Sequence, residues 1–300
     1  MTSRSRAHVS WFALVAIPAL FVAIGFLQMR IEAETRTVAE QKEELLLRSG
    51  PTLKRLSLGY DSLLGDIYWT RAVQYYGARV GNPGEKFELL WPMLDITTTL
   101  DPNLIVAYRF GAIFLSEPMP TGADRSDLAV ELVKKGVAAN PDSWELSSDL
   151  GFLYYWHLKD YEKASAAYLQ GSKIPNAPSW MKMMAAQVAE KGNAFSNSLA
   201  IWSELYETTQ NEKVKKNAFQ HLQSLHALQD TLELNKLAEE YSKQYGRYPS
   251  SMKELYERGL LQGAPLDPAG FPYRFGADGK AQLDPNSPVS LPRFSESPTQ

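Results

Sequence analysis

Apolar and small residues recur at one spacing in two stretches of the chain between residues 101 and 175. The first stretch opens with Phe110-Gly111 and the second with Leu150-Gly151, and an aromatic residue follows three positions after each glycine. Residues three and four positions apart share one face of an α-helix, so each pair predicts a first helix. A second helix is predicted in each stretch by apolar or small residues that precede a proline: Ala129, Val133, Gly136 and Pro141, then Ala164, Tyr168, Gly171 and Pro175.

The two stretches therefore predict two helical hairpins in phase with each other. Pro102, Pro141 and Pro175 lie 39 and 34 positions apart, and a proline cannot continue a helix. The small residues would let two antiparallel helices approach closely while the large ones fill the space between them. The alternative is an ordinary amphipathic hairpin, which also shows apolar residues three and four apart.

This period and pattern resemble the tetratricopeptide repeat. The resemblance implies a mostly α fold, a right-handed solenoid of helix hairpins with a binding groove along the first helices. A degenerate unit over residues 56–102 and a weaker one over 178–210 extend the pattern, and helical spacing continues to residue 245. We expect repeats and a capping helix over residues 55–245.

The amino-terminal region predicts a membrane anchor. Residues 1–8 are polar and basic, and Val9–Leu27 contains no charged residue, a length close to that of a transmembrane helix. We expect a transmembrane helix over residues 9–29 and a stalk over 30–54, with a cleaved signal peptide as the alternative. Arg4 and Arg6 favour a cytoplasmic amino terminus. The bulk of the chain is then extracytoplasmic, in the periplasm of a bacterium with two membranes.

Residues 246–284 change in character and resemble part of the major pseudopilin of type II secretion systems. A Gly-Arg-Tyr-Pro segment at 246–249 leads to an Asp-Pro-Ala-Gly-Phe-Pro-Tyr loop at 267–273. We expect a short helix capped by Ser250 and a hairpin of strands Tyr273–Gly276 and Lys280–Leu283. The family's metal-binding loop would fall near Asp278 and Asp284, but its ligand pattern is not reproduced. Residues 285–300, rich in Pro and Ser, are expected to be a disordered tail.

Composition removes several kinds of function. The chain of 300 residues has no cysteine, hence no disulfide or thiolate chemistry, and its 31 basic and 34 acidic residues leave no basic surface for nucleic acid. None of the four histidines has the spacing of a zinc-binding helix. We expect no catalytic residues, no cofactor and no metal.

Binding to another protein is the function that the pattern favours. The repeat resemblance implies a groove that contains several aromatic residues, which anchor partner segments well. Packing of these aromatics in the core is the alternative. We expect a membrane-anchored extracytoplasmic scaffold or adaptor for another envelope protein, or alternatively a structural component of a secretion or pilus-like apparatus. The residues that the resemblance places in the groove are Asp66, Trp69, Tyr108, Ala112, Leu115, Phe152, Tyr155 and Trp156.

Overall fold

The computed structural model of the protein describes residues 20, 22–27, 30 and 49–292. These residues are mostly helical, as the sequence predicts, and form two compact units. The first unit runs to Arg79 and includes Glu85–Asp101, and the second comprises Val80–Gly84 and everything from Pro102 onward. The amino terminus, most of the anchor expected over 9–29 and most of the stalk lie outside the described residues. No helix in the described ranges is long and apolar enough to cross a membrane.

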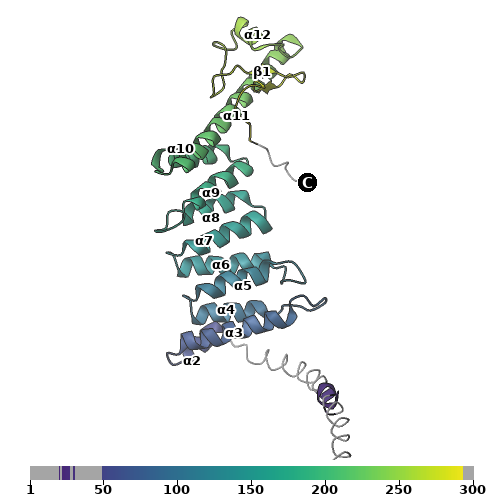
Figure 1. Cartoon of the computed structure of the whole chain (residues 1–300), viewed down its shortest axis with the longest axis vertical. Helices are drawn as coiled ribbons and strands as arrows, with labels where there is room; N and C mark the ends of the chain where they lie inside the picture. Colours follow the sequence, from purple (N-terminus) through teal and green to yellow (C-terminus); the bar gives the residue numbers. More distant parts are fainter. Residues whose placement is uncertain (1–19, 21, 28–29, 31–48, 293–300) are drawn as a thin grey trace, which may run out of the picture. The chain divides into compact units, whose positions relative to one another are not determined.

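The first unit contains helices α2 (Gly50–Leu56), α3 (Asp61–Arg79) and α4 (Leu90–Leu100), and α3 lies beside α4 (Figure 1). Its core joins Tyr68 of α3 to Ile96 and Leu100 of α4. Helix α2 packs on α4, where a Cβ atom at Gly50 would lie 2.8 Å from Cβ of Thr99. A small residue is therefore required at the start of α2.

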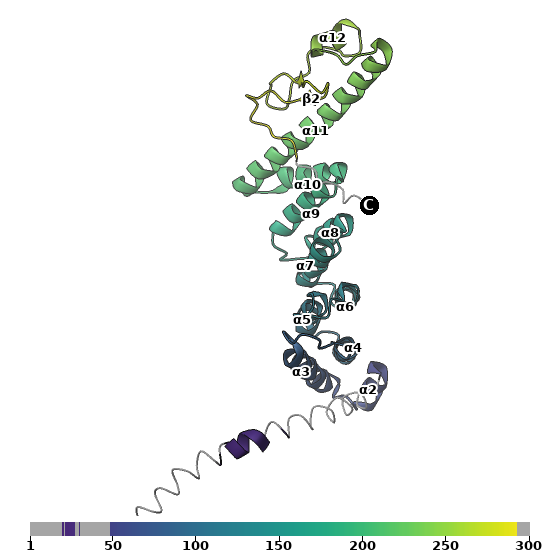
Figure 2. The ribbon, with the colours of Figure 1, turned by 90° about the vertical axis from the view of Figure 1, so that its right-hand side faces the viewer.

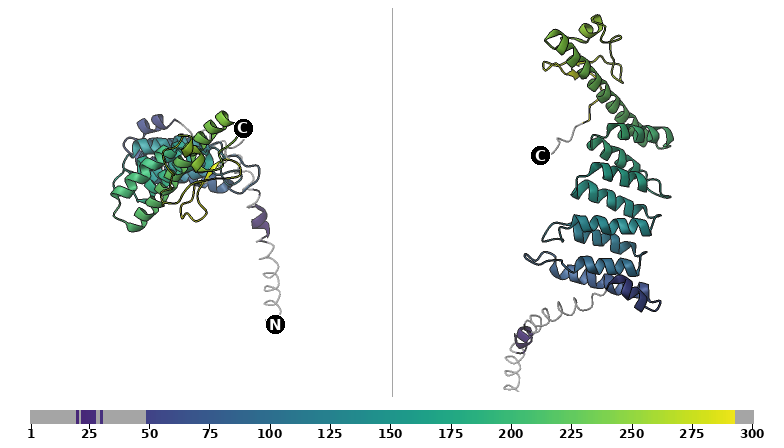
Figure 3. Two further views of the ribbon diagram at one scale, coloured as in Figure 1. Left: turned by 90° about the horizontal axis from the view of Figure 1, so that it is seen from above. Right: turned by 180° about the vertical axis from the view of Figure 1, so that it is seen from behind.

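The second unit begins with a series of helices, each packed against the next in chain order (Figure 1, and from behind in Figure 3). The helices that the sequence predicts around Gly111, Gly136, Gly151 and Gly171 are all present. The series comprises α5 (Ile105–Ser116), α6 (Ser126–Ala139), α7 (Trp144–Phe152), α8 (Tyr161–Gly171), α9 (Trp180–Lys191), α10 (Phe195–Thr208) and α11 (Glu212–Tyr245).

Three glycines of these helices, Gly136, Gly151 and Gly171, lie where a neighbouring side chain leaves no room for a Cβ atom. At Gly136 that atom would lie 2.8 Å from Cγ of Tyr108, and at Gly171 it would lie 2.6 Å from Cβ of Ser147. Tyr108 has no exposed surface, because it fills the space above Gly136. The alternation of large and small residues thus corresponds to direct contacts between helices.

Helix α7 does not end as an α-helix. Its last turn is a π-helix, η1 (Leu153–His157), in which the Leu158 N–H donates to the Leu153 carbonyl oxygen at 3.2 Å, five residues back. Lys159 follows with a φ of 54°, and Asp160 then caps α8 by accepting from the Lys163 N–H at 3.0 Å. The wider π-helical turn rotates the side chains of η1 about the helix axis relative to an α-helical count.

Helix α11 is one continuous helix of 34 residues, where the sequence leaves open one capping helix or two. The Asn211 side chain caps its first turn by accepting from two main-chain N–H groups, and Gly246 ends it with a φ of 72°. His221 stacks on the buried Trp202 of α10 with ring centroids 4.2 Å apart. This stacking fixes the amino-terminal half of α11 on the preceding hairpin.

The carboxyl-terminal segment folds against the other half of α11 (Figure 2). It contains α12 (Met252–Glu257) and the antiparallel strands β1 (Arg274–Phe275) and β2 (Ala281–Gln282), so the predicted hairpin is confirmed with shorter strands. The residue at the start of α12 is Ser251, not Ser250 as expected. Ser250 instead donates its N–H to Glu254 at 2.8 Å.

Asp267 organises the loop that precedes the hairpin. Its buried carboxylate accepts the N–H groups of Ala269 at 2.9 Å and Phe271 at 2.8 Å. The hydroxyl of Ser287 donates to the other oxygen. Ser287 lies in the range expected to be disordered, so the start of that range is held on the fold by Asp267, while residues 293–300 lie outside the described residues.

Candidate functional site

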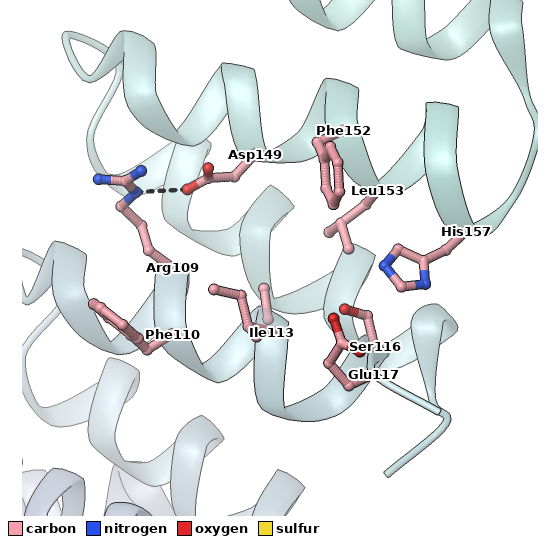
Figure 4. A pocket seen from close by; sticks show the side chains of 10 residues that line it. Arg109, Phe110, Ile113, Ser116, Glu117, Asp149, Phe152, Leu153 and His157 are labelled. Carbon is pink, nitrogen blue, oxygen red and sulfur yellow. Dashed lines mark hydrogen bonds and ion pairs between the residues drawn. The ribbon is translucent and has the colours of Figure 1, made fainter. Parts of the chain in front are cut away.

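A groove in the second unit lies between α5 and the α7–η1 helix (Figure 4). Its volume is about 210 Å³. An engineered apolar cavity of about 150 Å³ holds a benzene molecule, so this groove has room for one large apolar side chain. Its lining residues are Arg109, Phe110, Ala112, Ile113, Ser116, Glu117, Asp149, Phe152, Leu153 and His157.

The walls of the groove are apolar and exposed. Phe110 is 51% exposed, Ile113 48% and Phe152 48%, although side chains of this kind are usually buried. Figure 4 shows Phe152 pointing from α7 toward α5, with Ile113 on the facing helix. Ala112 and Leu153 are buried beneath them. A contiguous exposed apolar surface of this kind is typical of a binding site.

One end of the groove is closed by an ion pair between the two helices. Nε of Arg109 on α5 donates to Oδ2 of Asp149 on α7 at 2.7 Å (Figure 4). Burial raises the pKa of Asp149, while the hydrogen bond from Arg109 opposes that rise. The same hydrogen bond raises the pKa of Arg109. We take the pair as charged, because the geometry is that of a charge-assisted hydrogen bond and the guanidinium cannot lose its proton.

The other end of the groove is polar and lies at the π-helix. His157, the last residue of η1, faces Ser116 and Glu117 at the end of α5 (Figure 4). Burial lowers the pKa of His157, and the nearby Glu117 carboxylate opposes this. The imidazole is therefore neutral near pH 7, where it can both donate and accept a hydrogen bond. π-Helical turns occur frequently at functional sites.

An aromatic surface continues from the groove along η1. The rings of Phe152 and Trp156 are stacked, with centroids 6.3 Å apart and planes at 8°. The Lys159 ammonium lies 4.8 Å from the Trp156 ring centroid. Tyr155 accepts a hydrogen bond from Lys191 at 2.8 Å, which ties it to the end of α9. Trp156 is 57% exposed, so this surface is accessible beside the groove.

The structure brings together only part of the residue set that the repeat resemblance implies. Phe152 and Ala112 line the groove, and Trp156 lies next to it through its stacking on Phe152. Tyr155 instead contacts Tyr161 of α8 and Lys191 of α9. Tyr108 and Leu115 do not line the groove, because both are completely buried between helices.

The other two expected residues belong to the first unit. Asp66 is an exposed residue of α3 whose main-chain oxygen accepts from the Thr70 hydroxyl at 2.8 Å, and Trp69 is half-buried on the same helix. Neither residue is among those that line the groove.

Sequence reasoning missed the polar ends of the groove and its α5 wall. The α5 wall is formed by Arg109, Phe110 and Ile113. The resemblance implies Tyr108 and Ala112 on the same helix, so the face of α5 that lines the groove is turned by about one residue from the face expected. Asp149 and His157 gave no signal, because one is an ordinary helix acid and the other is positioned by a π-helix that has no simple sequence pattern.

The groove has no group of side chains typical of a metal site. Throughout the described part of the chain, no three or more His, Asp and Glu side chains are grouped so that they could hold a metal ion. The groove offers an apolar slot with a charged pair at one end and a neutral donor and acceptor at the other.

Comparison with known proteins assigns no family. A scan against protein-family models gives no match, and no curated protein matches the chain.

Proposed function

We propose that the chain is a membrane-anchored extracytoplasmic scaffold that binds a segment of another envelope protein in the α5–α7 groove. The observation that carries this proposal is the exposed apolar wall of Phe110, Ile113 and Phe152 around a slot of about 210 Å³. Polar groups lie at both ends of this groove, so it suits a short peptide segment with one large apolar side chain. Such a side chain would be the anchor of the complex.

The fold that supports this function is a tetratricopeptide-like solenoid. Three hairpins follow in sequence, α5–α6, α7–α8 and α9–α10, and in the first two a glycine lies against a tyrosine of the partner helix. In this repeat family the first helices of the hairpins line the binding groove, and α5 and α7 are two successive first helices. The uncharged run Val9–Leu27 would attach this scaffold to the cytoplasmic membrane, with the amino terminus in the cytoplasm.

Photo-crosslinking tests this proposal. A photoreactive phenylalanine analogue is placed at position 152 of the full chain in its source organism, and the adducts are identified by mass spectrometry. Phe219 of α11 is the matched control, since it is 45% exposed and lies outside the groove. We expect an adduct with one envelope protein from position 152 and none from 219. Equal labelling at both positions would refute the groove, and a cytoplasmic adduct would refute the location.

Substitution of the wall gives a second test that separates binding from folding. Ile113→Ala and Phe152→Ala remove apolar surface that is half exposed, so the free energy of unfolding should change little. The same two changes should abolish recovery of the crosslinked partner by affinity purification. A partner that remains bound to the folded double variant would exclude the groove as its site.

A second candidate function is that of a structural part of a secretion or pilus-like apparatus. The resemblance of residues 246–284 to part of the major pseudopilin supports it. In this segment the Tyr273 hydroxyl donates to Asp230 of α11 at 2.7 Å, which holds the segment on the helix. The discriminating measurement is the size of the native membrane complex for the full chain and for a chain that ends after Tyr245. Loss of a large complex on truncation would favour this candidate.

A further inference from the structure

The first unit carries a group of exposed large apolar side chains near its amino-terminal end. They lie within twelve consecutive residues, from the end of α2 through the following loop into α3. Single exposed apolar residues are ordinary, but a group of this size indicates a surface that is covered in the working protein. This loop patch consists of Leu56, Leu58, Tyr60, Leu63 and Ile67.

The loop at the centre of the patch is fixed in place and holds Leu58 outward. The Ser57 hydroxyl donates to the Lys54 carbonyl oxygen at 2.7 Å and also contacts Asp61, and the Tyr60 N–H donates to the Ser57 carbonyl oxygen at 3.0 Å. Leu58 has a φ of 53°, in the left-handed region that disfavours branched side chains, and is 88% exposed. Such strain persists mostly where the surrounding structure or a function requires it.

The rest of the patch continues the same surface along α3. Tyr60, Leu63 and Ile67 are three and four positions apart and share one side of the helix. Tyr60 is 68% exposed and combines an apolar ring with a hydroxyl. Aromatic residues of this kind are enriched where a protein meets the boundary between lipid headgroups and hydrocarbon.

The length of chain before the patch indicates what covers it. Leu27, the last residue of the uncharged run, and Leu56 are 29 positions apart in the sequence. At 1.5 Å per helical residue this segment spans about 45 Å, and even fully extended it reaches only about 100 Å. A patch tethered so closely to a membrane-spanning segment has a high effective concentration at the membrane surface.

We propose that the loop patch inserts into the headgroup region of the membrane that holds the amino-terminal anchor. This inference rests on the proposed anchorage. Lys54 and Arg55 lie beside the patch, but Asp61 and Asp66 balance their charge, so burial of apolar surface drives the contact. Binding should therefore depend little on the fraction of anionic lipid. The contact would hold the first unit against the bilayer.

The absence of cysteine from the chain allows a direct test. Leu58→Cys in the full chain, reconstituted into phosphatidylcholine vesicles, is labelled with an environment-sensitive fluorophore. Quenching is then compared for nitroxide-labelled lipids and for aqueous iodide. Glu207→Cys, an exposed position of α10, is the control. We expect position 58 to be quenched several-fold more by the lipid nitroxide than position 207, and several-fold less by iodide.

Each other result overturns the inference in a recognisable way. Strong iodide quenching at position 58 in a chain that floats with the vesicles would refute the patch and leave the anchorage intact. Protection from both quenchers would show that a second copy or residues 31–48 cover the patch. Failure of the unlabelled chain to float with the vesicles would refute both proposals. Because Leu58 is so exposed, its replacement should leave the unfolding curve unchanged, which circular dichroism checks.

Discussion

Gly151 of α7 lies against the ring of Tyr168 of α8, so closely that a Cβ atom at position 151 would be 2.9 Å from three ring atoms. Tyr168 is buried, and burial raises its pKa to about 12. We expect Gly151→Ala to lower the free energy of unfolding of the second unit by about 1–3 kcal/mol, as overpacking generally does. Urea unfolding followed by circular dichroism measures it.

Gly77 provides the matched control for this substitution. It lies within α3, and a Cβ atom there would meet nothing within 4 Å. Gly77→Ala should raise the free energy of unfolding by about 0.5–1 kcal/mol, because alanine favours helix. A gain at both positions would show that the contact between Gly151 and Tyr168 does not limit packing.

The ion pair at the end of the groove predicts a pH-dependent loss of stability in Arg109→Met. Burial raises the pKa of Asp149, so this group's contribution to stability falls as the pH rises through the range between its unfolded and folded pKa values. Removal of Arg109 raises that pKa further. We expect a loss of about 1–2 kcal/mol near pH 7, because Arg109 is partly exposed, and a smaller loss near pH 4.

The pair formed by Arg125 and Asp127 is the control for this prediction. It has two hydrogen bonds of 2.8 and 2.6 Å, better geometry than the groove pair, but both side chains are more than half exposed. Arg125→Met should leave the free energy of unfolding unchanged. An equal loss in both variants at both pH values would contradict the assigned role of burial.

The lowered pKa of Glu254 predicts that acid destabilises the carboxyl-terminal segment. This pKa is lowered to about 2, mainly by the hydrogen bond from Arg247 and then by those from Ser250 and Tyr241. The stabilisation is fully present above the ordinary pKa of 4.5 and is lost as the pH falls toward about 2. Glu254→Gln should remove this dependence, measured by tyrosine fluorescence during acid titration. Glu257→Gln, which alters an exposed pair with Lys253, should retain it.

Asp267→Ala should unfold the loop before the hairpin. The change leaves the N–H groups of Ala269 and Phe271 and the Ser287 hydroxyl without their acceptor in a buried place. We expect a loss of about 3 kcal/mol and rapid proteolysis between residues 259 and 290. Asp278→Ala removes one hydrogen bond of 3.1 Å at an exposed turn, so it should change neither. Protease resistance of the Asp267 variant would show that the loop is held by apolar packing instead.

The helical hairpins could be predicted from sequence because their spacing reflects contacts between neighbouring helices. Gly136 makes room for Tyr108, and Gly151 makes room for Tyr168, so each small residue marks a place where two helices touch. The carboxyl-terminal hairpin was predictable for a similar reason, since its turn of Gly276 to Gly279 is local.

The face that forms the groove could not be predicted in the same way. Tyr108 is an aromatic residue in a first helix, but the space above Gly136 buries it, and its neighbours Arg109 and Phe110 are exposed instead. The π-helix shifts the register of Trp156 and His157 relative to an α-helical count. Contacts between distant residues, such as that between Arg109 and Asp149, depend on the packing angle of the helices.

Helix α11 has a mechanical consequence. Its amino-terminal half stacks His221 on Trp202, and its carboxyl-terminal half accepts the Tyr273 hydroxyl and the Ala281 N–H through Asp230 and Asn235. Its 34 residues form a rod about 50 Å long with no break. A pull or a twist applied to the carboxyl-terminal segment would pass along this rod into α10. Each residue inserted near its middle would turn the segment by about 100° about the rod axis.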